Sequence, residues 1–411
     1  MRKSAIVLIV SSLLLAACGD DDDGTVGGGS ATTTGAAGTS QTVTLALGGP
    51  FSGASKSTGD KIRAGARLAA DEINNAGGIT GGPLKGARIG FKEFDDTGVP
   101  AQGATNMRTI VDDKEILAFV GSGSSDVSVA QAPVASETGF PYLSAYGSSP
   151  KILEAATAKK SVFVIAPTFP AYAFSVTDEL LKAGRTKPGI IHQTGTYGDG
   201  VADLVVARLR QKNMSPVAKE PFKSTDTDMR TQLAKIKDAE PDSLIMVGLA
   251  PTDALILKQA DEIGLKVPAY DPGGITKNDQ FLKDAGPLAE GVVGNTPSYE
   301  PRDTGATRSL KEGYTKATGE SVVPDPAVFS YEGVRAVAAA LAEGATGRED
   351  LPDHLRRISI SDTGVGSLRF AADGSRIGGR LYVFRINNGK PEYFISYEQT
   401  GPQEVKEVPL G

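Results

Sequence analysis

Residues 116–138 read ILAFVGSGSSDVSVAQAPVASET, and this stretch decides the fold class. Ile116–Val120 is a short apolar run typical of a buried strand, and Val127–Thr138 has the pattern of a helix that Pro133 kinks. A serine-rich turn, Ser122–Ser125, joins the two. A strand followed at once by a helix is the unit from which parallel sheets covered by helices are built. The stretch therefore predicts an α/β protein.

The same unit recurs on both sides of this stretch. Between residues 42 and 144 the strands are predicted at 42–47, 88–94, 116–120 and 142–144. A second series of alternating strands and helices runs from about residue 162 to 270, and further helices follow at 307–318 and 327–343. Near the end, Asn387-Asn388-Gly389 between two alternating runs indicates a β-hairpin.

Two series of strand–helix units predict two Rossmann-like lobes. The predicted boundaries are 42–166 with 296–364 for lobe 1, 167–295 with 365–400 for lobe 2, and 401–411 for a polar tail. Three hinge crossings would join the lobes, with a ligand cleft between them. Open parallel sheets bind ligands at the carboxyl ends of their strands, so the loops at those ends are the candidate site.

The N-terminus predicts export. Two basic residues precede an apolar run, and Leu15-Ala16-Ala17-Cys18 follows, which is typical of a secretory signal peptide over residues 1–17. Leu-Ala-Ala-Cys resembles the lipobox of bacterial lipoproteins, which implies cleavage before Cys18 and its lipidation. A plain signal peptide with a chance cysteine is the alternative. Residues 18–41 are acidic and then rich in Gly, Ser and Thr, so they are predicted to form a disordered tether.

Composition argues against several function classes. The net charge of −6 and the lack of a basic stripe make nucleic acid an unexpected partner. The chain has only two histidines and lacks the HExxH, GxSxG and complete phosphate-loop motifs, so we expect neither catalysis nor a cofactor. The acidic run Asp20–Asp23 lacks the spaced oxygen ligands of a calcium loop, and no metal is expected.

Several short motifs together carry a family resemblance. They are Gly49-Pro50-Phe51-Ser52-Gly53, Glu72-Ile73-Asn74-Asn75-Ala76-Gly77-Gly78-Ile79, Phe94-Asp95-Asp96, Val120–Ser125, Leu143–Pro150 and His192–Gly200. Their order and spacing resemble the leucine/isoleucine/valine-binding protein family, the type I periplasmic binding proteins that serve ABC transporters. The resemblance implies a monomeric, lipid-anchored protein on the outer face of the cytoplasmic membrane. It would bind a small amino acid or related carboxylate or amide and pass it to permease subunits.

Two alternatives stay open at this point. A lipoprotein of the same fold could present its ligand to a separate sensor. The solute could also lie outside the amino acids, as urea, an amide or an aromatic acid does.

The turn Ser122–Ser125 is the first candidate for ligand contact. Free backbone N–H groups and the positive end of the following helix favour an anion there, and serine hydroxyls add donors. Simple capping of the helix by Ser124 or Ser125 is the other interpretation. The resemblance implies that Ser125 binds the ligand carboxylate.

The loops after the next strands supply the other candidates. The resemblance implies that Ser148 donates to the carboxylate and that the Tyr146 carbonyl accepts from the ligand ammonium, whereas Pro150 could simply set a turn. Tyr197 stands where the family covers the ligand, although a packed core tyrosine would look the same.

Three positions depart from the branched-chain pattern. Thr58 replaces a large aromatic residue, Ala250 stands near the place of a second cleft tyrosine, and Gly273 replaces the glutamate that pairs with the ligand ammonium. Asp253 or Asp271 could take over that pairing from a neighbouring position.

The lipobox interpretation makes a direct prediction. Cys18→Ala should leave the protein folded but release it from the membrane, because residues 19–41 are expected to pack against nothing. Fractionation of cells into membrane and soluble parts measures this. A Cys18→Ala protein that stays on washed membranes would contradict the interpretation.

Overall fold

The computed structural model describes residues 41–410 apart from 275, 278 and 298–300. Residues 40–411 form one compact unit. The predicted signal peptide, Cys18 and the predicted tether lie outside the described residues. Within the described part of the chain, no helix is both long and apolar enough to span a bilayer.

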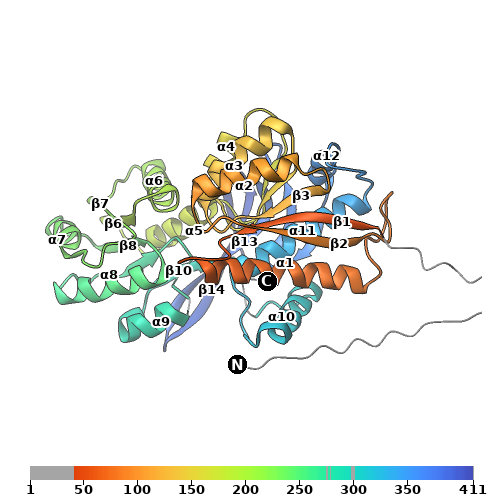
Figure 1. Cartoon of the computed structure of the whole chain (residues 1–411). Coiled ribbons are helices and arrows are strands. Elements are labelled where there is room, and N and C mark those ends of the chain that lie inside the picture. Colours follow the sequence, from red (N-terminus) through yellow and green to blue (C-terminus); the bar gives the residue numbers. More distant parts are fainter. Residues whose placement is uncertain (1–40, 275, 278, 298–300, 411) are drawn as a thin grey trace, which may run out of the picture. The chain divides into compact units, whose positions relative to one another are not determined.

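The first sheet has five parallel strands in the order β2-β1-β3-β4-β5. Figure 1 labels β1, β2 and β3 of this sheet. The strands are β1 (Thr42–Gly49), β2 (Arg88–Asp95), β3 (Ile116–Gly121), β4 (Tyr142–Ser144) and β5 (Val162–Val164). Alternate side chains face opposite sides, so Leu45 and Leu47 pack toward one helix layer and Ala46 toward the other. The first layer contains α1 (Lys56–Asn75), α10 (Gly305–Thr318), α11 (Asp325–Ala342) and α12 (Leu351–Arg357). The second contains α2 (Pro100–Asp112), α3 (Ser125–Thr138) and α4 (Lys151–Ala155).

Helices α1 and α11 approach each other closely within the first layer. Gly65 of α1 lies against the backbone of α11, where an added Cβ would be 2.0 Å from the carbonyl oxygen of Ala327. Only glycine fits such a contact, and the alanine-rich sequence of α11 is compatible with it. The contact brings residues from the two ends of the chain into one core, because α11 returns to the first sheet after the chain has built the second.

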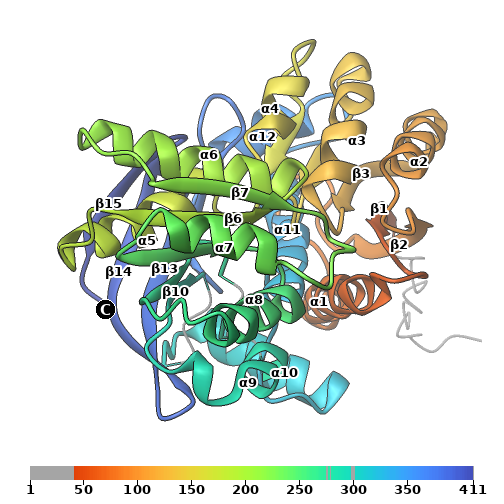
Figure 2. The same ribbon diagram turned by 90° about the vertical axis from the view of Figure 1, so that its left-hand side faces the viewer.

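The second sheet begins with parallel strands in the order β7-β6-β8-β9-β10 and continues with antiparallel ones. The strands are β6 (Pro188–Gln193), β7 (Ala218–Phe222), β8 (Ser243–Val247), β9 (Ala269–Asp271), β10 (Val293–Thr296), β11 (Ile360–Thr363), β12 (Gly366–Phe370), β13 (Arg376–Asn387), β14 (Lys390–Gly401) and β15 (Glu404–Val408). Helices α5 (Phe169–Lys182) and α6 (Thr196–Gln211) cover one face, and α7 (Arg230–Asp238), α8 (Ala250–Glu262) and α9 (Asp279–Ala285) cover the other. Figure 2 shows α6 and α8 on opposite sides of β6 and β7.

The α/β class with two parallel-stranded lobes is confirmed, and so is the hairpin at Asn387–Gly389. Asn387 pairs with Lys390, and Asn388 and Gly389 both have positive φ values, 52° and 71°, as a two-residue type I′ turn requires.

Two segments near the end of the chain make contacts that join distant parts of the sequence. β12 pairs with β13 of the second sheet and puts Leu368 and Phe370 into the core of the first sheet, where Phe370 contacts Phe163 with ring centroids 4.9 Å apart. The two side chains are on the same face of the strand, so they are buried together. The expected polar tail contains β15, which pairs with β14 and places Val405 against the apolar surface of the second sheet.

A buried ion pair ties the crossings between the lobes to α11. Arg376, at the start of β13, is fully buried and donates to the Glu332 carboxylate over 2.5 Å. It also donates to the carbonyl of Ile165, where the chain leaves the first sheet, at 2.9 Å. Its other nitrogen donates to Thr363 Oγ1 at 3.0 Å and to the carbonyl of Ser367 at 2.8 Å. One guanidinium thus bonds both to Ile165, just after β5, and to Thr363 and Ser367, on either side of the turn between β11 and β12.

Removing this guanidinium should destabilise the fold strongly. Arg376→Met leaves the Glu332 carboxylate buried without its partner, a change that typically costs about 3–5 kcal/mol. Urea unfolding measures it through the transition midpoint. Arg308→Met, which breaks the exposed pair with Asp303, is the matched control and should cost less than about 1 kcal/mol. Equal effects of the two substitutions would contradict the assigned role of Arg376.

Candidate ligand-binding site

The serine turn after β3 is held in a strained conformation. Ser122 has φ 71°, a left-handed value that is uncommon for residues with a side chain, and its hydroxyl donates to the carbonyl of Ser124 at 3.0 Å. Ser124 is the N-cap of α3, where its Oγ accepts from the Val127 amide at 3.3 Å. The helix-capping interpretation thus describes Ser124, whereas Ser125 has a different partner.

Ser125 and Ser148 bring two neighbouring loops together. The amide of Ser148 donates to Ser125 Oγ at 3.3 Å. Ser125 is buried and Ser148 is half-buried. Because β3 and β4 are adjacent parallel strands, the loops that follow them meet at the same edge of the sheet. Both serines therefore lie at the N-terminal end of α3, where the helix dipole favours a negative charge.

A hydrogen-bonded layer beneath the two loops limits their movement. Ser128 Oγ and Ser144 Oγ are 3.0 Å apart, and Ser144 donates to the carbonyl of Gly147 at 2.8 Å. A Cβ added at Gly147 would lie 2.3 Å from Ser128 Oγ, so only glycine fits. Tyr142 extends the layer by donating to Gln131 Oε1 at 2.9 Å.

Asp96 lies at the end of β2 and is 1% exposed. Its Oδ1 accepts from the Gly98 amide at 2.8 Å, and its Oδ2 has no hydrogen-bond partner among the described residues. Burial, with a smaller effect from the neighbouring Asp95 charge, raises the pKa of Asp96 to about 6. Burial raises the pKa of Tyr142, and the charge of Asp96 raises it further, so Asp96 lies beside the polar layer that supports the serine loops.

Thr58 stands against the serine turn from the other side. It is half-buried in the first turn of α1, and its Cγ2 would be 3.6 Å from a Cβ on Gly123. Pro50 also packs against Gly123. The first lobe thus brings Thr58, Ser125 and Ser148 together.

The second lobe contributes Tyr197 from the first turn of α6. Its hydroxyl donates to the carbonyl of Gly248 at 3.3 Å, and its ring stands edge-on to Phe169 with centroids 5.8 Å apart. A Cβ at Gly273 would lie 1.9 Å from the Tyr197 hydroxyl. The hydroxyl therefore occupies the space next to the backbone that any larger side chain at position 273 would need.

Tyrosines of both lobes approach one another. Burial raises the pKa of Tyr197 well above its usual value, and nearby Asp271, Asp253, Tyr146 and Tyr172 raise it further. Tyr146 comes from the first lobe, where its ring stacks on Phe329 with centroids 6.4 Å apart. Tyr172, on α5, was missed by sequence reasoning because a tyrosine inside an apolar helix gives no local signal of a site.

Asp253 and Asp271 are both fully buried, but their surroundings differ. Asp271 Oδ1 accepts from the Gly273 amide at 2.6 Å, and its Oδ2 accepts from the Thr276 amide at 2.8 Å. Neither oxygen of Asp253 has a hydrogen-bond partner among the residues the structure describes. Burial raises the pKa of Asp253 well above its usual value, and the charge of Asp271 adds to this.

Two hydrogen bonds connect the lobes directly at this edge. The Thr196 amide, just before Tyr197, donates to Asp126 Oδ1 at 3.2 Å. The Phe169 amide, at the start of α5, donates to the carbonyl of Ser148 at 3.2 Å. Asp126 was also missed, since an acidic residue in the first turn of a helix is ordinary. The loops that carry the candidate residues therefore contact each other across the lobes.

Residues 42–391 match the family described as periplasmic binding protein. The chain belongs to this family. The Leu/Ile/Val-binding protein homolog 3 of Brucella melitensis is 24% identical over 354 residues, which cover 85% of this chain and 92% of that protein.

Solved structures agree with the fold of a periplasmic binding protein. The branched-chain amino acid transporter substrate binding protein LivJ of Streptococcus pneumoniae, in complex with isoleucine, is similar with a TM-score of 0.74 and 22% identity. The similarity covers 90% of this chain and 99% of LivJ. A solute binding protein of an ABC transporter from Rhodopseudomonas palustris, in complex with 3,4-dihydroxy benzoic acid, has a TM-score of 0.76 and 18% identity. That similarity covers 88% of this chain and 98% of that protein.

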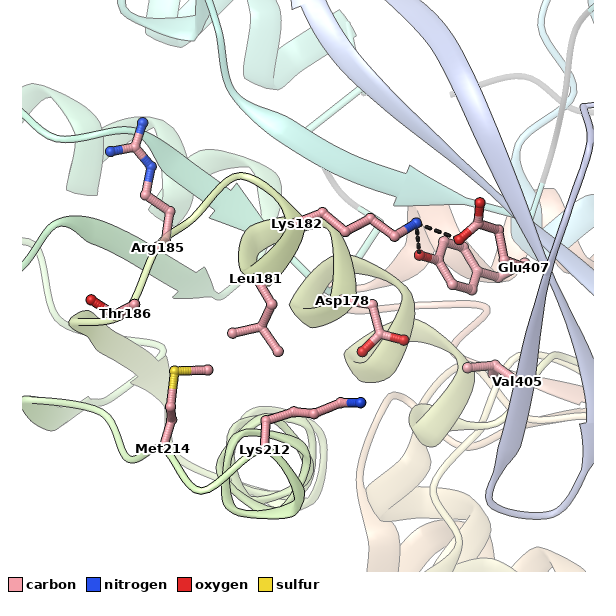
Figure 3. A pocket seen from close by; sticks show the side chains of 10 residues that line it. Asp178, Leu181, Lys182, Arg185, Thr186, Lys212, Met214, Val405 and Glu407 are labelled. Carbon is pink, nitrogen blue, oxygen red and sulfur yellow. Dashed lines mark hydrogen bonds and ion pairs between the residues drawn. The ribbon is translucent and has the colours of Figure 1, made fainter.

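This periplasmic binding protein also has a cavity of about 510 Å³ far from the candidate site (Figure 3). It is lined by residues near the C-terminal ends of α5 and α6 and by Tyr397, Val405 and Glu407 of β14 and β15. Lys182 closes one side by bonding to the Tyr397 hydroxyl and the Glu407 carboxylate. Tyr172 and Tyr197 lie at the opposite, N-terminal ends of these helices. No group of three or more metal-ligating side chains occurs in the described ranges.

Asp96 makes the stability of this periplasmic binding protein depend on pH. Its folded-state pKa of about 6 lies above the ordinary value of 3.8, so the fold favours the protonated acid. Its contribution to stability is therefore greatest at low pH and falls as the pH rises from about 4 through about 6. Asp96→Asn removes this dependence, and its stability relative to the parent should rise by about 2 kcal/mol between pH 4 and pH 7.

Urea unfolding of both proteins at the two pH values measures the difference. Asp71→Asn, which changes an exposed acid on α1, is the control and should show no such trend. A pH-independent difference between Asp96→Asn and the parent would contradict the assignment.

Proposed function

We propose that this protein is the extracytoplasmic solute-binding component of an ABC uptake transporter. It binds a small amino acid of the branched-chain type, or a related small carboxylate or amide, and presents it to permease subunits. The meeting of Ser125 and Ser148 at the N-terminal end of α3 is the observation that carries this proposal. The relatives named for leucine, isoleucine and valine binding support the solute class.

A ligand carboxylate fits the serine loops on electrostatic grounds. The first amides of α3 have no partner within the helix, and they lie at the same end of α3 as Ser125 and Ser148. Hydrogen bonds to a charged group are stronger than those between neutral groups. The layer beneath the loops fixes the donors before the ligand arrives, so little ordering entropy is lost on binding.

The remaining candidates take supporting roles in the same proposal. The Thr58 methyl borders the carboxylate end, and the Tyr146 carbonyl faces the ligand from the first lobe. Tyr197 covers the ligand from the second lobe. Closure uses binding energy alone, because a ligand that touches both lobes binds the closed form more tightly than the open one. The contact between Asp126 and Thr196 belongs to that closed form.

An aromatic carboxylate is the second candidate solute. Solved structures of this fold include solute binding proteins in complex with benzoate and with 4-hydroxybenzoate, with TM-scores of 0.73 and 0.75. The same serine loops would hold the carboxylate of either class. The distinction therefore depends on what the second lobe offers to the other end of the ligand.

We also propose that the mature protein is lipidated on Cys18 and attached to the outer face of the cytoplasmic membrane. The sequence Leu15-Ala16-Ala17-Cys18 supports this, and the family is extracytoplasmic. A tether of some two dozen Gly-rich residues would span roughly 25–30 Å, enough to keep a folded body clear of the lipid surface.

The serine loops provide the test of solute binding. Ser125→Ala and Ser148→Ala each remove a hydrogen bond to a charged group, worth about 1.5–3 kcal/mol, so affinity should fall roughly ten- to a hundredfold. Calorimetric titration with leucine and with benzoate measures this, after a thermal-shift screen has identified which of them binds. Ser215→Ala, an exposed serine between α6 and β7, is the control. Unchanged binding in the double variant Ser125→Ala/Ser148→Ala would place the site elsewhere.

A further inference from the structure

Three buried polar side chains lack a full set of hydrogen bonds at one edge of the second sheet. They are Asp253, Thr276 and Asn295, in which both Asp253 oxygens, Thr276 Oγ1 and Asn295 Oδ1 have no partner among the described residues. Asp253 follows β8, Thr276 follows β9, and Asn295 lies in β10. These strands are neighbours and parallel, so their carboxyl ends share an edge.

Of the three side chains, Asp253 has the largest free-energy cost of burial without a hydrogen-bond partner. It is fully buried in the first turn of α8, and one of its oxygens would lie 2.3 Å from a Cβ on Gly248. The carbonyl of the same Gly248 accepts from the Tyr197 hydroxyl. The carboxyl group thus lies next to the residue that we assign to cover the ligand. A buried carboxylate normally has a partner, because desolvation without compensation costs several kcal/mol.

Asp271 has a different role, although it is as fully buried as Asp253. Its two oxygens accept from the amides of Gly273 and Thr276, so it fixes the turn between these residues. That turn keeps Gly273 against the Tyr197 hydroxyl. Asp271 is accordingly a positioning residue.

We propose that Asp253 is the counter-charge for a cationic group of the bound solute. The inference rests on the proposed function, since it places the cationic group at the other end of a ligand whose carboxylate lies on the serine loops. The serine hydroxyl donors lie on the first lobe, and the Asp253 carboxyl group lies on the second. The solute class that matches both ends is a zwitterion with an ammonium group, such as an α-amino acid, rather than a simple aromatic carboxylate.

Asn295 is held from the side of α5. Its amide nitrogen donates to the carbonyl of Tyr172 at 2.8 Å and to Ser175 Oγ at 2.9 Å. These two bonds set the orientation of its side chain. A Cβ on Gly274 would lie 3.6 Å from Asn295 Oδ1, so this oxygen lies beside the turn that Asp271 holds.

Because of the charged groups around Asp253, the proposal predicts that this carboxyl group loses a proton when the ligand binds. The titratable groups that face it are Asp271 from β9 and Tyr197 from α6, and no basic side chain of the described residues offsets its burial. Burial without a partner therefore favours the protonated form of Asp253 in the ligand-free protein. A ligand ammonium favours the carboxylate form, so the O–H bond of Asp253 breaks on binding and the proton passes to the buffer. The ammonium itself stays protonated.

Proton release on binding can be measured directly. Leucine is titrated into the native protein at pH 7 in phosphate and in Tris, whose ionisation enthalpies differ widely. The difference between the two binding enthalpies gives the number of protons released, and about one per leucine is expected. 4-Methylpentanoate, which lacks the ammonium, should bind at least tenfold more weakly and release none.

Two variants test whether proton release and affinity depend on Asp253 itself or on any acid of the same helix. Asp253→Asn should lose the proton release and bind leucine about ten- to a hundredfold more weakly, with a melting point at least as high as that of the parent. Asp261→Asn changes an exposed acid on the same helix and should alter neither quantity. A purely structural Asp253 would instead show a lower melting point and unchanged proton release.

The outcomes distinguish this inference from the proposed function. The same titrations are run with the twenty common amino acids and with benzoate, so a zwitterion other than leucine is found if it is the ligand. If only solutes without a cationic group bind, the role of Asp253 is overturned and solute capture stands. The role of Asp253 is also overturned if a zwitterion binds without proton release and with the same affinity to Asp253→Asn as to the parent protein. If nothing in the panel binds, both proposals fail.

Discussion

Parallel strands require a crossover helix between them, and this requirement places every candidate residue of the molecule. Each strand of a parallel series ends at the same edge of its sheet, and each crossover helix begins there. The first sheet therefore collects helix N-termini and serine hydroxyls at one edge, around Ser125 and Ser148. The second collects Tyr197, Asp253 and Asn295 at its own edge. In the proposed complex, these two edges offer the ligand two chemically different ends to bind.

Much of this arrangement could be predicted from the sequence, because strand–helix alternation and turn formation depend on residues close together in the chain. The serine turn, the strand–helix units and the hairpin at Asn387–Gly389 are all determined by residues close together in the chain. The missed features depend on distant neighbours. Tyr172 and Asp126 gain their roles only from partners on the other lobe, and the raised pKa of Asp96 depends on burial that no sequence pattern reveals. The same holds for β12, whose Phe370 is buried by a strand some two hundred residues earlier.

The distribution of hydrogen bonds determines which parts of the molecule are rigid and which can move relative to each other. The loops of the first lobe are held by hydroxyl-to-hydroxyl and hydroxyl-to-carbonyl bonds, and Arg376 locks the crossings to α11. The contacts between the lobes at the site are single hydrogen bonds by comparison, such as the one from Thr196 to Asp126. A solute that adds charge-assisted bonds to both lobes can therefore shift the equilibrium between open and closed forms.

The contact between Gly273 and Tyr197 restricts how this protein can change its preference over evolutionary time. A side chain at position 273 would meet the tyrosine hydroxyl, so a larger residue there requires the Tyr197 side chain to move. A change at residue 197 alone removes the hydrogen bond to the Gly248 carbonyl. The effect of a substitution at either position therefore depends on the residue at the other, and we expect the two positions to change together.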